Sequence, residues 1–208
     1  MGSVVELKYL GSTLTSDGTS NKEVEIRIAV ATAAMTKLQE IWKSKISLNT
    51  KIRLYRSLVL SIFLYGCETW TLYADTERRI QAFEMKCYRK ILRVLYTEHR
   101  TNNDIREEIS AFTGRQEPLL AIVKRRKLAW FGHTTRHDSL CKTVLQGTVD
   151  GGRRRGRQRK SWMCNIKEWT SLPMPELLAT AEDRSTWRKM AVSSSRKSPL
   201  RRPSQGTE

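Results

Sequence analysis

Apolar side chains between residues 24 and 42 recur at alternating steps of four and three residues, the spacing of one face of an α-helix. The face consists of Val24, Ile28, Ala31, Met35, Leu38 and Trp42. It is about five helical turns long, and so much apolar surface must be covered by other parts of the fold. Just before it, Ser20 and Glu23 have the spacing of a capping box. The sequence therefore predicts one long, half-buried helix that begins after residue 20.

Two further segments show the same periodicity. One begins near Asn49 or Thr50 and is expected to end at Gly66, and the other begins near Asp75 or Thr76. Their apolar faces are formed by Ile52, Tyr55, Val59 and Ile62, and by Ile80, Phe83, Cys87, Ile91 and Val94. Each helix has a single apolar face, so residues 21–97 are predicted to form a three-helix bundle.

The residues on either side of the bundle differ from it. Alternation of Val5, Leu7 and Tyr9, followed by an Asp17-Gly18 turn, predicts a short β ribbon over residues 1–20. Two strands alone are marginally stable, so we expect this ribbon to be part of a larger sheet. Residues 98–192 contain shorter helical patterns, including one over Leu119–Thr135, and residues 193–208 have the composition of a disordered tail. The predicted fold class is mainly α.

Positive charge is concentrated in the second half of the chain. The net charge is +17. Residues 1–110 hold 17 Lys and Arg against 13 Asp and Glu, and residues 111–208 hold 21 against 8. The densest part is Gly151–Lys160, in which six of ten residues are cationic. Such a segment cannot form a core, and its guanidinium groups suit phosphate oxygens. By itself it is equally typical of a nuclear-import tag or a solvated linker.

A nucleic-acid-binding function follows from this distribution. The predicted phosphate contacts are Lys124, Arg125, Arg126, Lys127, Arg153, Arg154, Arg155, Arg157, Arg159 and Lys160. Trp130 and His133 lie close to them in the sequence, and Trp130 is a candidate for stacking on a base. The alternative for Trp130 is packing. The tryptophans on apolar helix faces are expected in the core: Trp42, Trp162, Trp169 and Trp187.

Three other patterns do not indicate chemistry. Tyr73-Ala-Asp-Thr76 is similar to a polymerase signature but lacks its second aspartate, so an N-cap is the better interpretation. His133, His137 and Cys141 have helical spacing, but no fourth ligand is evident and Gly132 makes one unbroken helix doubtful, so no metal is expected. The four cysteines form no CxxC pair and are expected to be reduced. The longest apolar stretch is too short to cross a membrane.

Several blocks of residues occur in the order found in one protein family. The first are Lys8-Tyr-Leu-Gly-Ser12, Ser16-Asp-Gly18, Lys51-Ile-Arg-Leu-Tyr55 and Leu64-Tyr-Gly-Cys-Glu-Thr-Trp70. The others are Met85-Lys-Cys-Tyr-Arg-Lys-Ile-Leu92, Arg125-Arg-Lys-Leu-Ala-Trp-Phe-Gly-His133, Gly151-Gly-Arg-Arg-Arg-Gly-Arg157 and Asp183-Arg-Ser-Thr-Trp-Arg188. Over about residues 7–192 the chain resembles the C-terminal part of the reverse transcriptase of non-LTR (LINE-type) retrotransposons. Gln158 and Cys164 depart from residues common in that family.

The resemblance implies a division of roles. Residues 1–20 would be the end of the catalytic palm, residues 21–97 a thumb-like bundle, and residues 98–192 a nucleic-acid-binding region. The palm carboxylates, the divalent metal they bind and the endonuclease would lie upstream of Met1. We therefore expect a non-catalytic fragment without a cofactor, nuclear or cytoplasmic, that binds RNA or DNA with little sequence specificity. The missing palm is a possible partner, and no membrane is expected.

Three alternatives remain open. The chain is a transposon relic with no selected function, a basic protein for import or architecture, or a polymerase subunit completed by another chain. The absent carboxylate pair disfavours the last of these. The exposed edge of the N-terminal strands also predicts poor solubility.

Overall fold

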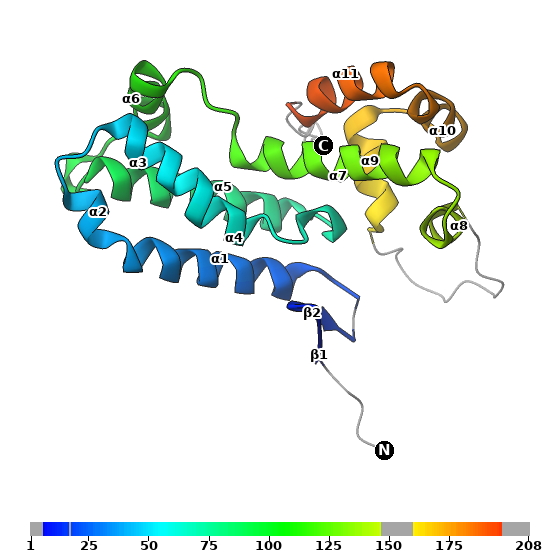
Figure 1. The fold of residues 1–208 in the computed structure, drawn as a ribbon, viewed down its shortest axis with the longest axis horizontal. Helices are drawn as coiled ribbons and strands as arrows, with labels where there is room; N and C mark the ends of the chain where they lie inside the picture. The colour runs from blue at the N-terminus through cyan, green and yellow to red at the C-terminus, as the bar shows by residue number, and fades with distance from the viewer. Residues whose placement is uncertain (1–5, 17, 147–159, 197–208) are drawn as a thin grey trace, which may run out of the picture. The chain divides into compact units, whose positions relative to one another are not determined.

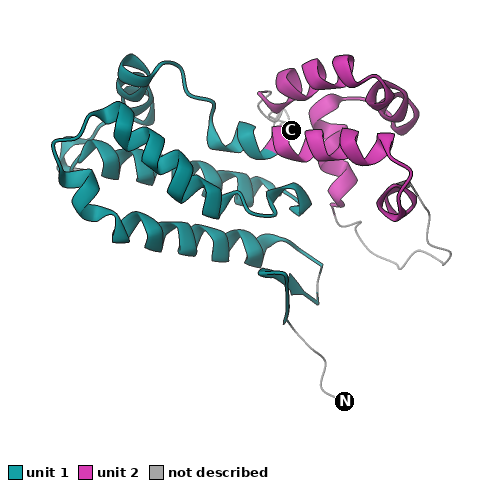
Figure 2. Cartoon of the chain, in the orientation of Figure 1, with its two compact units in different colours: residues 1–123 teal, residues 124–208 magenta. Residues whose placement is uncertain are grey.

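The structure, a computed structural model, describes residues 6–16, 18–146 and 160–196. The chain divides into two compact units, residues 1–123 and 124–208 (Figure 2). The described residues are mostly helical, and a two-stranded antiparallel sheet lies at their N-terminal end (Figure 1). The predicted fold class is confirmed. The boundary between the units falls inside α7 (Leu119–Arg136), whereas the sequence prediction ended the helical bundle at residue 97.

Unit 1 is built around three long helical segments. These are α1 (Asn21–Lys37), the segment formed by α3 (Leu48–Leu54), a π-helical stretch (Tyr55–Leu60) and α4 (Ser61–Phe63), and α5 (Ala74–Leu92). Helices α2 (Gln39–Lys43) and α6 (Asn102–Thr113) are shorter. In the core, the Phe63 ring stacks on Phe83 with centroids 5.1 Å apart, and Trp70 meets Phe63 edge-on. The three predicted apolar faces therefore cover one another.

The first helix is shorter than the periodicity predicts. It ends at Lys37, and α2 begins at Gln39, so the apolar face is continuous in sequence but divided between two helices. The indole Nε1 of buried Trp42 donates a hydrogen bond to the Met35 carbonyl at 2.8 Å. That carbonyl would bond the residue-39 amide in an uninterrupted helix. The bend thus provides a partner for an indole N–H that would otherwise be buried without one.

The predicted capping box at the start of α1 does not form. The Ser20 side chain accepts no bond from its own helix and instead accepts one from the Thr71 amide at 3.0 Å. The Glu23 carboxylate accepts a bond from the Thr13 amide at 2.6 Å and pairs with Arg27 Nε at 2.6 Å. Both side chains therefore hold other segments of unit 1 to α1.

The hairpin of β1 (Glu6–Tyr9) and β2 (Ser12–Thr15) is attached to unit 1 through polar groups. The Arg27 guanidinium donates to the Gly11 carbonyl and lies 4.5 Å from the centroid of the Tyr65 ring. The Tyr65 hydroxyl donates to the Leu10 carbonyl at 2.6 Å. The Lys8–Ser12 and Leu64–Trp70 blocks are therefore neighbours in the fold, and Tyr65 fastens the hairpin turn.

Replacing Glu23 with alanine is expected to detach the hairpin. The change leaves the Thr13 amide without its buried carboxylate acceptor, which costs about 2 kcal/mol. Hydrogen exchange at Thr13 should accelerate roughly thirtyfold, while exchange in the middle of α5 stays unchanged. Glu25→Ala, at an exposed position of the same helix, is the matched control. Equal exchange at Thr13 in the two variants would contradict this assignment.

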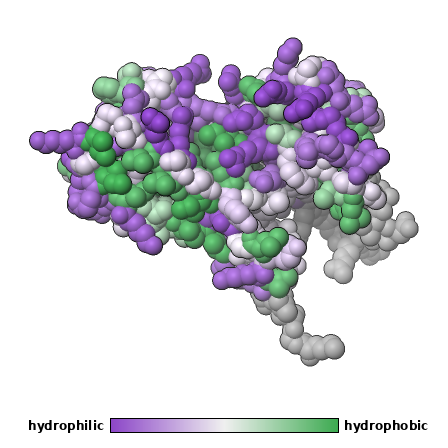
Figure 3. Space-filling view, viewed as in Figure 1, coloured by the Kyte–Doolittle hydropathy of each residue, from purple (hydrophilic) through white to green (hydrophobic). Residues whose placement is uncertain are grey.

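The hairpin exposes an apolar face. Leu7 and Leu14 are paired across the two strands, and both are more than half exposed, as are Tyr9 and Leu10. Figure 3 shows apolar side chains on the hairpin and across the visible face of unit 1. Exposed apolar strands favour association, so poor solubility stays a prediction.

The path from α6 to α7 is anchored by side chains. Thr101 and Asp104 form a capping box at the start of α6. The buried Glu84 carboxylate accepts a bond from the Leu119 amide at 2.7 Å, at the first residue of α7. Burial raises the pKa of Glu84, and Arg106, whose guanidinium lies 3.8 Å away, opposes that shift. A carboxylate at this position also interacts favourably with the positive end of the α7 dipole.

Unit 2 contains the rest of α7 together with α8 (Leu140–Gln146), α9 (Trp162–Thr170), α10 (Met174–Glu182) and α11 (Arg184–Ser195). Asp183 caps α11 by accepting a bond from the Ser185 amide at 2.9 Å. Helix α11 continues to Ser195, so the tail predicted to be disordered from residue 193 begins with helix. Residues 197–208 of that tail lie outside the described residues.

Candidate nucleic-acid interface

Two of the predicted phosphate contacts are in the interior of unit 2. Lys124 is 1% exposed and Lys127 is 0% exposed. Their positions follow from the helix period, because both fall in step with buried Leu128 and Phe131 on one face of α7. A phosphate contact needs an accessible donor, and in this conformation neither amine is accessible. Contact of Lys124 and Lys127 with phosphate therefore stays a prediction that this conformation does not favour. Their spacing from Leu128 and Phe131 is visible in the sequence and would have identified them.

Tryptophan rings of α9 surround the two lysines. Lys127 Nζ lies 4.5 Å from the centroid of the Trp162 ring and 5.4 Å from that of Trp169, and it donates to Asn165 Oδ1 at 2.8 Å. Lys124 Nζ lies 5.2 Å from the Trp169 centroid. Burial, together with the charge of Lys160, lowers the pKa of Lys127 to about 6. The lysine–tryptophan cluster, which joins α7 to α9, consists of Lys124, Lys127, Trp162, Asn165 and Trp169.

The remaining predicted residues of α7 are accessible to different degrees. Arg126 and His133 are exposed, and Arg125 and Trp130 are half-buried. The Trp130 ring meets Trp162 edge-on with centroids 5.3 Å apart, and the His133 ring is 4.5 Å from that of His137. Trp130 therefore packs on one side and has a partly accessible surface, and its use for base stacking stays a prediction.

We call the cationic segment Gly151–Lys160 the arm. Only one residue of the arm is described. Lys160 is half-buried and pairs with Glu168 at 2.6 Å, which fixes the point where the chain enters α9. The others lie outside the described residues: Arg153, Arg154, Arg155, Arg157 and Arg159.

Some exposed cations of unit 2 were not among the predicted contacts. They are Lys167 of α9 and Arg184, Arg188 and Lys189 of α11. Arg184 and Arg188 are four residues apart and so project from one side of α11. That spacing is visible in the sequence, although these cations form no continuous basic run.

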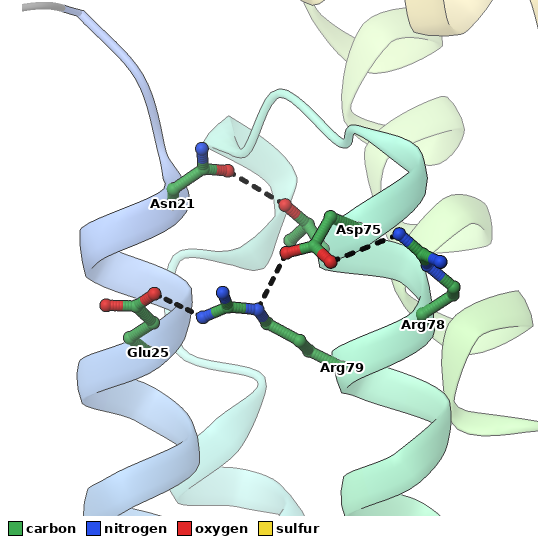
Figure 4. Close-up of polar contacts among 6 residues, drawn as sticks. Asn21, Glu25, Asp75, Arg78 and Arg79 are labelled. Carbon is green, nitrogen blue, oxygen red and sulfur yellow. Dashed lines mark hydrogen bonds and ion pairs between the residues drawn. The ribbon is translucent and has the colours of Figure 1, made fainter.

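The polymerase-like Tyr73–Thr76 segment has a structural role. Asp75 is not the N-cap predicted from the sequence: Tyr73 occupies that position, and Asp75 lies two residues further on, in the first turn of α5. Its carboxylate pairs with Arg79 Nε at 2.8 Å and with Arg78 at 3.3 Å (Figure 4). Arg79 also pairs with Glu25 of α1. Thr76 donates to Asn21 Oδ1 at 2.8 Å. These contacts connect the N-terminal turns of α1 and α5 and leave the Asp75 carboxylate between two arginines.

The histidine–cysteine pattern is divided between two helices. Helix α7 ends at Arg136, and Cys141 belongs to α8. Within the described ranges, no three His, Cys, Asp or Glu side chains are placed to hold a metal ion. Nor does this part of the chain contain a helix that is both long and apolar enough to cross a membrane.

Comparison with curated proteins finds a relative that is described as transposon-derived. An uncharacterized transposon-derived protein of Caenorhabditis elegans is 29% identical over 133 residues, which is 64% of this chain and 47% of that protein. The similarity indicates a transposon origin. The chain spans about half the length of this relative. No protein-family model matches the chain, and no solved structure matches it.

Proposed function

We propose that the chain is a non-catalytic nucleic-acid-binding piece of a retrotransposon reverse transcriptase, and that unit 2 makes the contacts. The charge of unit 2 carries this proposal. Residues 124–208 hold 20 Lys and Arg against 7 Asp and Glu, a net charge of +13. A surface with this excess of positive charge attracts polyanions through counterion release.

The proposed contact set differs from the sequence-based one. It comprises Arg125, Arg126 and Lys160 of the described residues, together with the arm arginines Arg153, Arg154, Arg155, Arg157 and Arg159. Lys124 and Lys127 are assigned instead to the core, where they hold α9 on α7. Phosphate contacts position a nucleic acid without reading its sequence, so we propose RNA or DNA as ligand with little base specificity.

The LINE-type assignment is part of the proposal. It is supported by the ordered sequence blocks and by the transposon origin that the relative indicates. Under this assignment polymerase chemistry, with its metal ions, belongs to another part of the parent enzyme. The same similarity is also compatible with a transposon relic that has no selected function, and binding measurements separate the two.

An electrophoretic shift assay of the full chain with RNA, single-stranded DNA and duplex at several salt concentrations tests the proposal. We expect binding to all three that weakens steeply with salt. Changing Arg153, Arg154 and Arg155 to alanine should lower the slope of log K against log salt by about 2 to 3, because three phosphate contacts are lost. Affinity at moderate salt should fall at least about tenfold.

The control removes the same charge from unit 1. Lys37, Lys45 and Arg53 are exposed there, and their alanine variants should retain the wild-type salt slope. Absence of binding at low salt would overturn the proposal and favour the relic. Equal losses of affinity in the arm and control variants would also overturn the proposal, because they would show that only the net charge of the chain matters.

A further inference from the structure

A cavity of about 120 Å³ opens between α1 and α5 in unit 1. Its lining residues are Thr32, Met35 and Thr36 of α1 and Phe83, Lys86, Cys87 and Lys90 of α5. We call it the α1–α5 cavity. It is far from the arm in sequence, and neither the proposed nucleic-acid contacts nor the hairpin attachment uses its residues.

The cavity brings two positive charges together. Lys86 and Lys90 are one helical turn apart on α5, where like charges repel each other. Lys90 Nζ donates to Thr36 Oγ1 across the opening at 3.3 Å. Among residues 6–16, 18–146 and 160–196, no carboxylate pairs with either ammonium group. An anion between the two lysines would relieve the repulsion.

The inner part of the cavity is apolar and firmly held. Met35, Phe83 and Cys87 are buried, and the Phe83 ring is stacked on Phe63. Burial raises the pKa of Cys87 to about 12, so its thiol adds no negative charge at neutral pH. A dry apolar cavity of about 150 Å³ is enough to hold a benzene molecule. At about 120 Å³ the α1–α5 cavity is somewhat smaller, so it suits the edge of a small ring or a short aliphatic group.

We propose that the α1–α5 cavity binds a phosphate monoester, with the phosphate between Lys86 and Lys90 and a small ring or aliphatic group against Met35 and Phe83. A monoester carries a charge of about −1.5 to −2 at pH 7, which matches two ammonium groups better than a carboxylate does. A monoester also carries a single organic group, so that group can enter the cavity while the phosphate stays between the two lysines. The source is either a small molecule or the terminal phosphate of a polynucleotide.

The test uses the full chain with ¹³C-labelled methionine methyl groups, observed by NMR. Phenyl phosphate should produce a saturable shift of the Met35 methyl resonance, because the ring current of the bound phenyl group acts on it. Inorganic phosphate should bind about tenfold more weakly, since it buries no ring. Lys86→Ala and Lys90→Ala should each weaken phenyl phosphate about tenfold, because each removes a charge-assisted contact.

Controls separate this site from general attraction to a basic protein. Lys37→Ala changes an exposed cation of α1 that does not line the cavity, and it should leave phenyl phosphate affinity unchanged. A saturable Met35 shift with a 5′-phosphorylated dinucleotide, absent without that phosphate, would identify a polynucleotide end as the source; a shift with phenyl phosphate alone would identify a small molecule. The proposal is overturned if phenyl phosphate gives no saturable Met35 shift, if phenol binds as tightly, or if Lys37→Ala weakens binding equally. None of these results depends on whether the arm binds nucleic acid.

Discussion

Gly132→Ala should destabilise unit 2 by roughly 3 kcal/mol, although alanine is the better helix former. A Cβ atom at residue 132 would lie 2.2 Å from Cδ1 and Nε1 of Trp187. That ring is 2% exposed, and its Nε1 donates to the Leu128 carbonyl at 2.8 Å. It has no room to retreat, because Phe131 packs against it with ring centroids 5.3 Å apart. The substitution therefore displaces the indole and breaks its hydrogen bond.

Calorimetry of the full chain, with hydrogen exchange to locate the loss in α11, measures this effect. For a unit of this size, the expected cost lowers the unfolding temperature by more than about 10 °C. A Trp187→Ala background provides the matched control, because it removes the ring that causes the clash. There, Gly132→Ala should stabilise by up to about 1 kcal/mol through helix propensity. If the substitution costs the same with and without the ring, the close approach to Trp187 is not the reason for glycine.

The second large effect concerns the pH dependence of unit 2. The pKa of Lys127 is lowered to about 6 in the folded chain, from an ordinary value of 10.5. Between these two values the unfolded chain binds a proton that the folded chain does not. Raising the pH across this window therefore favours folding, by up to about 1.4 kcal/mol per pH unit. This gain in unfolding free energy should be complete above pH 10.5 and absent below pH 6. Among the described residues, Lys160 lowers this pKa and Cys164 and Glu168 raise it, and Lys160 has the largest influence of the three.

A double substitution isolates this contribution. Lys127→Met with Asn165→Leu removes the amine together with the amide oxygen that accepts its hydrogen bond, so no new unpaired group is created between them. Between pH 7 and pH 9 the unfolding free energy of the wild type should rise by about 3 kcal/mol more than that of this variant. Lys167→Met, at an exposed position of α9, should retain the wild-type slope. Parallel pH profiles for wild type and double variant would show that Lys127 remains protonated in the folded chain.

The helices of this protein were largely predictable from the sequence. The segment predicted at Leu119–Thr135 forms α7, Leu119–Arg136, and the third predicted helix begins within two residues of its observed start. These features depend on the period of apolar residues and on local turn residues, which act over a few positions of the chain. The candidate site was less predictable. Arg126 and His133 are exposed, but Lys124 and Lys127, which were predicted to contact phosphate, are buried.

By itself, then, the sequence determined the fold class, the helical segments, the concentration of charge in residues 111–208 and the arm that forms its densest part. Only the tertiary structure decided which polar groups are structural. Ser20 and Glu23 bond Thr71 and Thr13 rather than capping their own helix, and Lys127 lies between two tryptophans of α9. The physical reason is that apolar periodicity is a property of one helix. A buried polar group instead takes its partner from whichever segment the fold brings near, often many residues away in the chain.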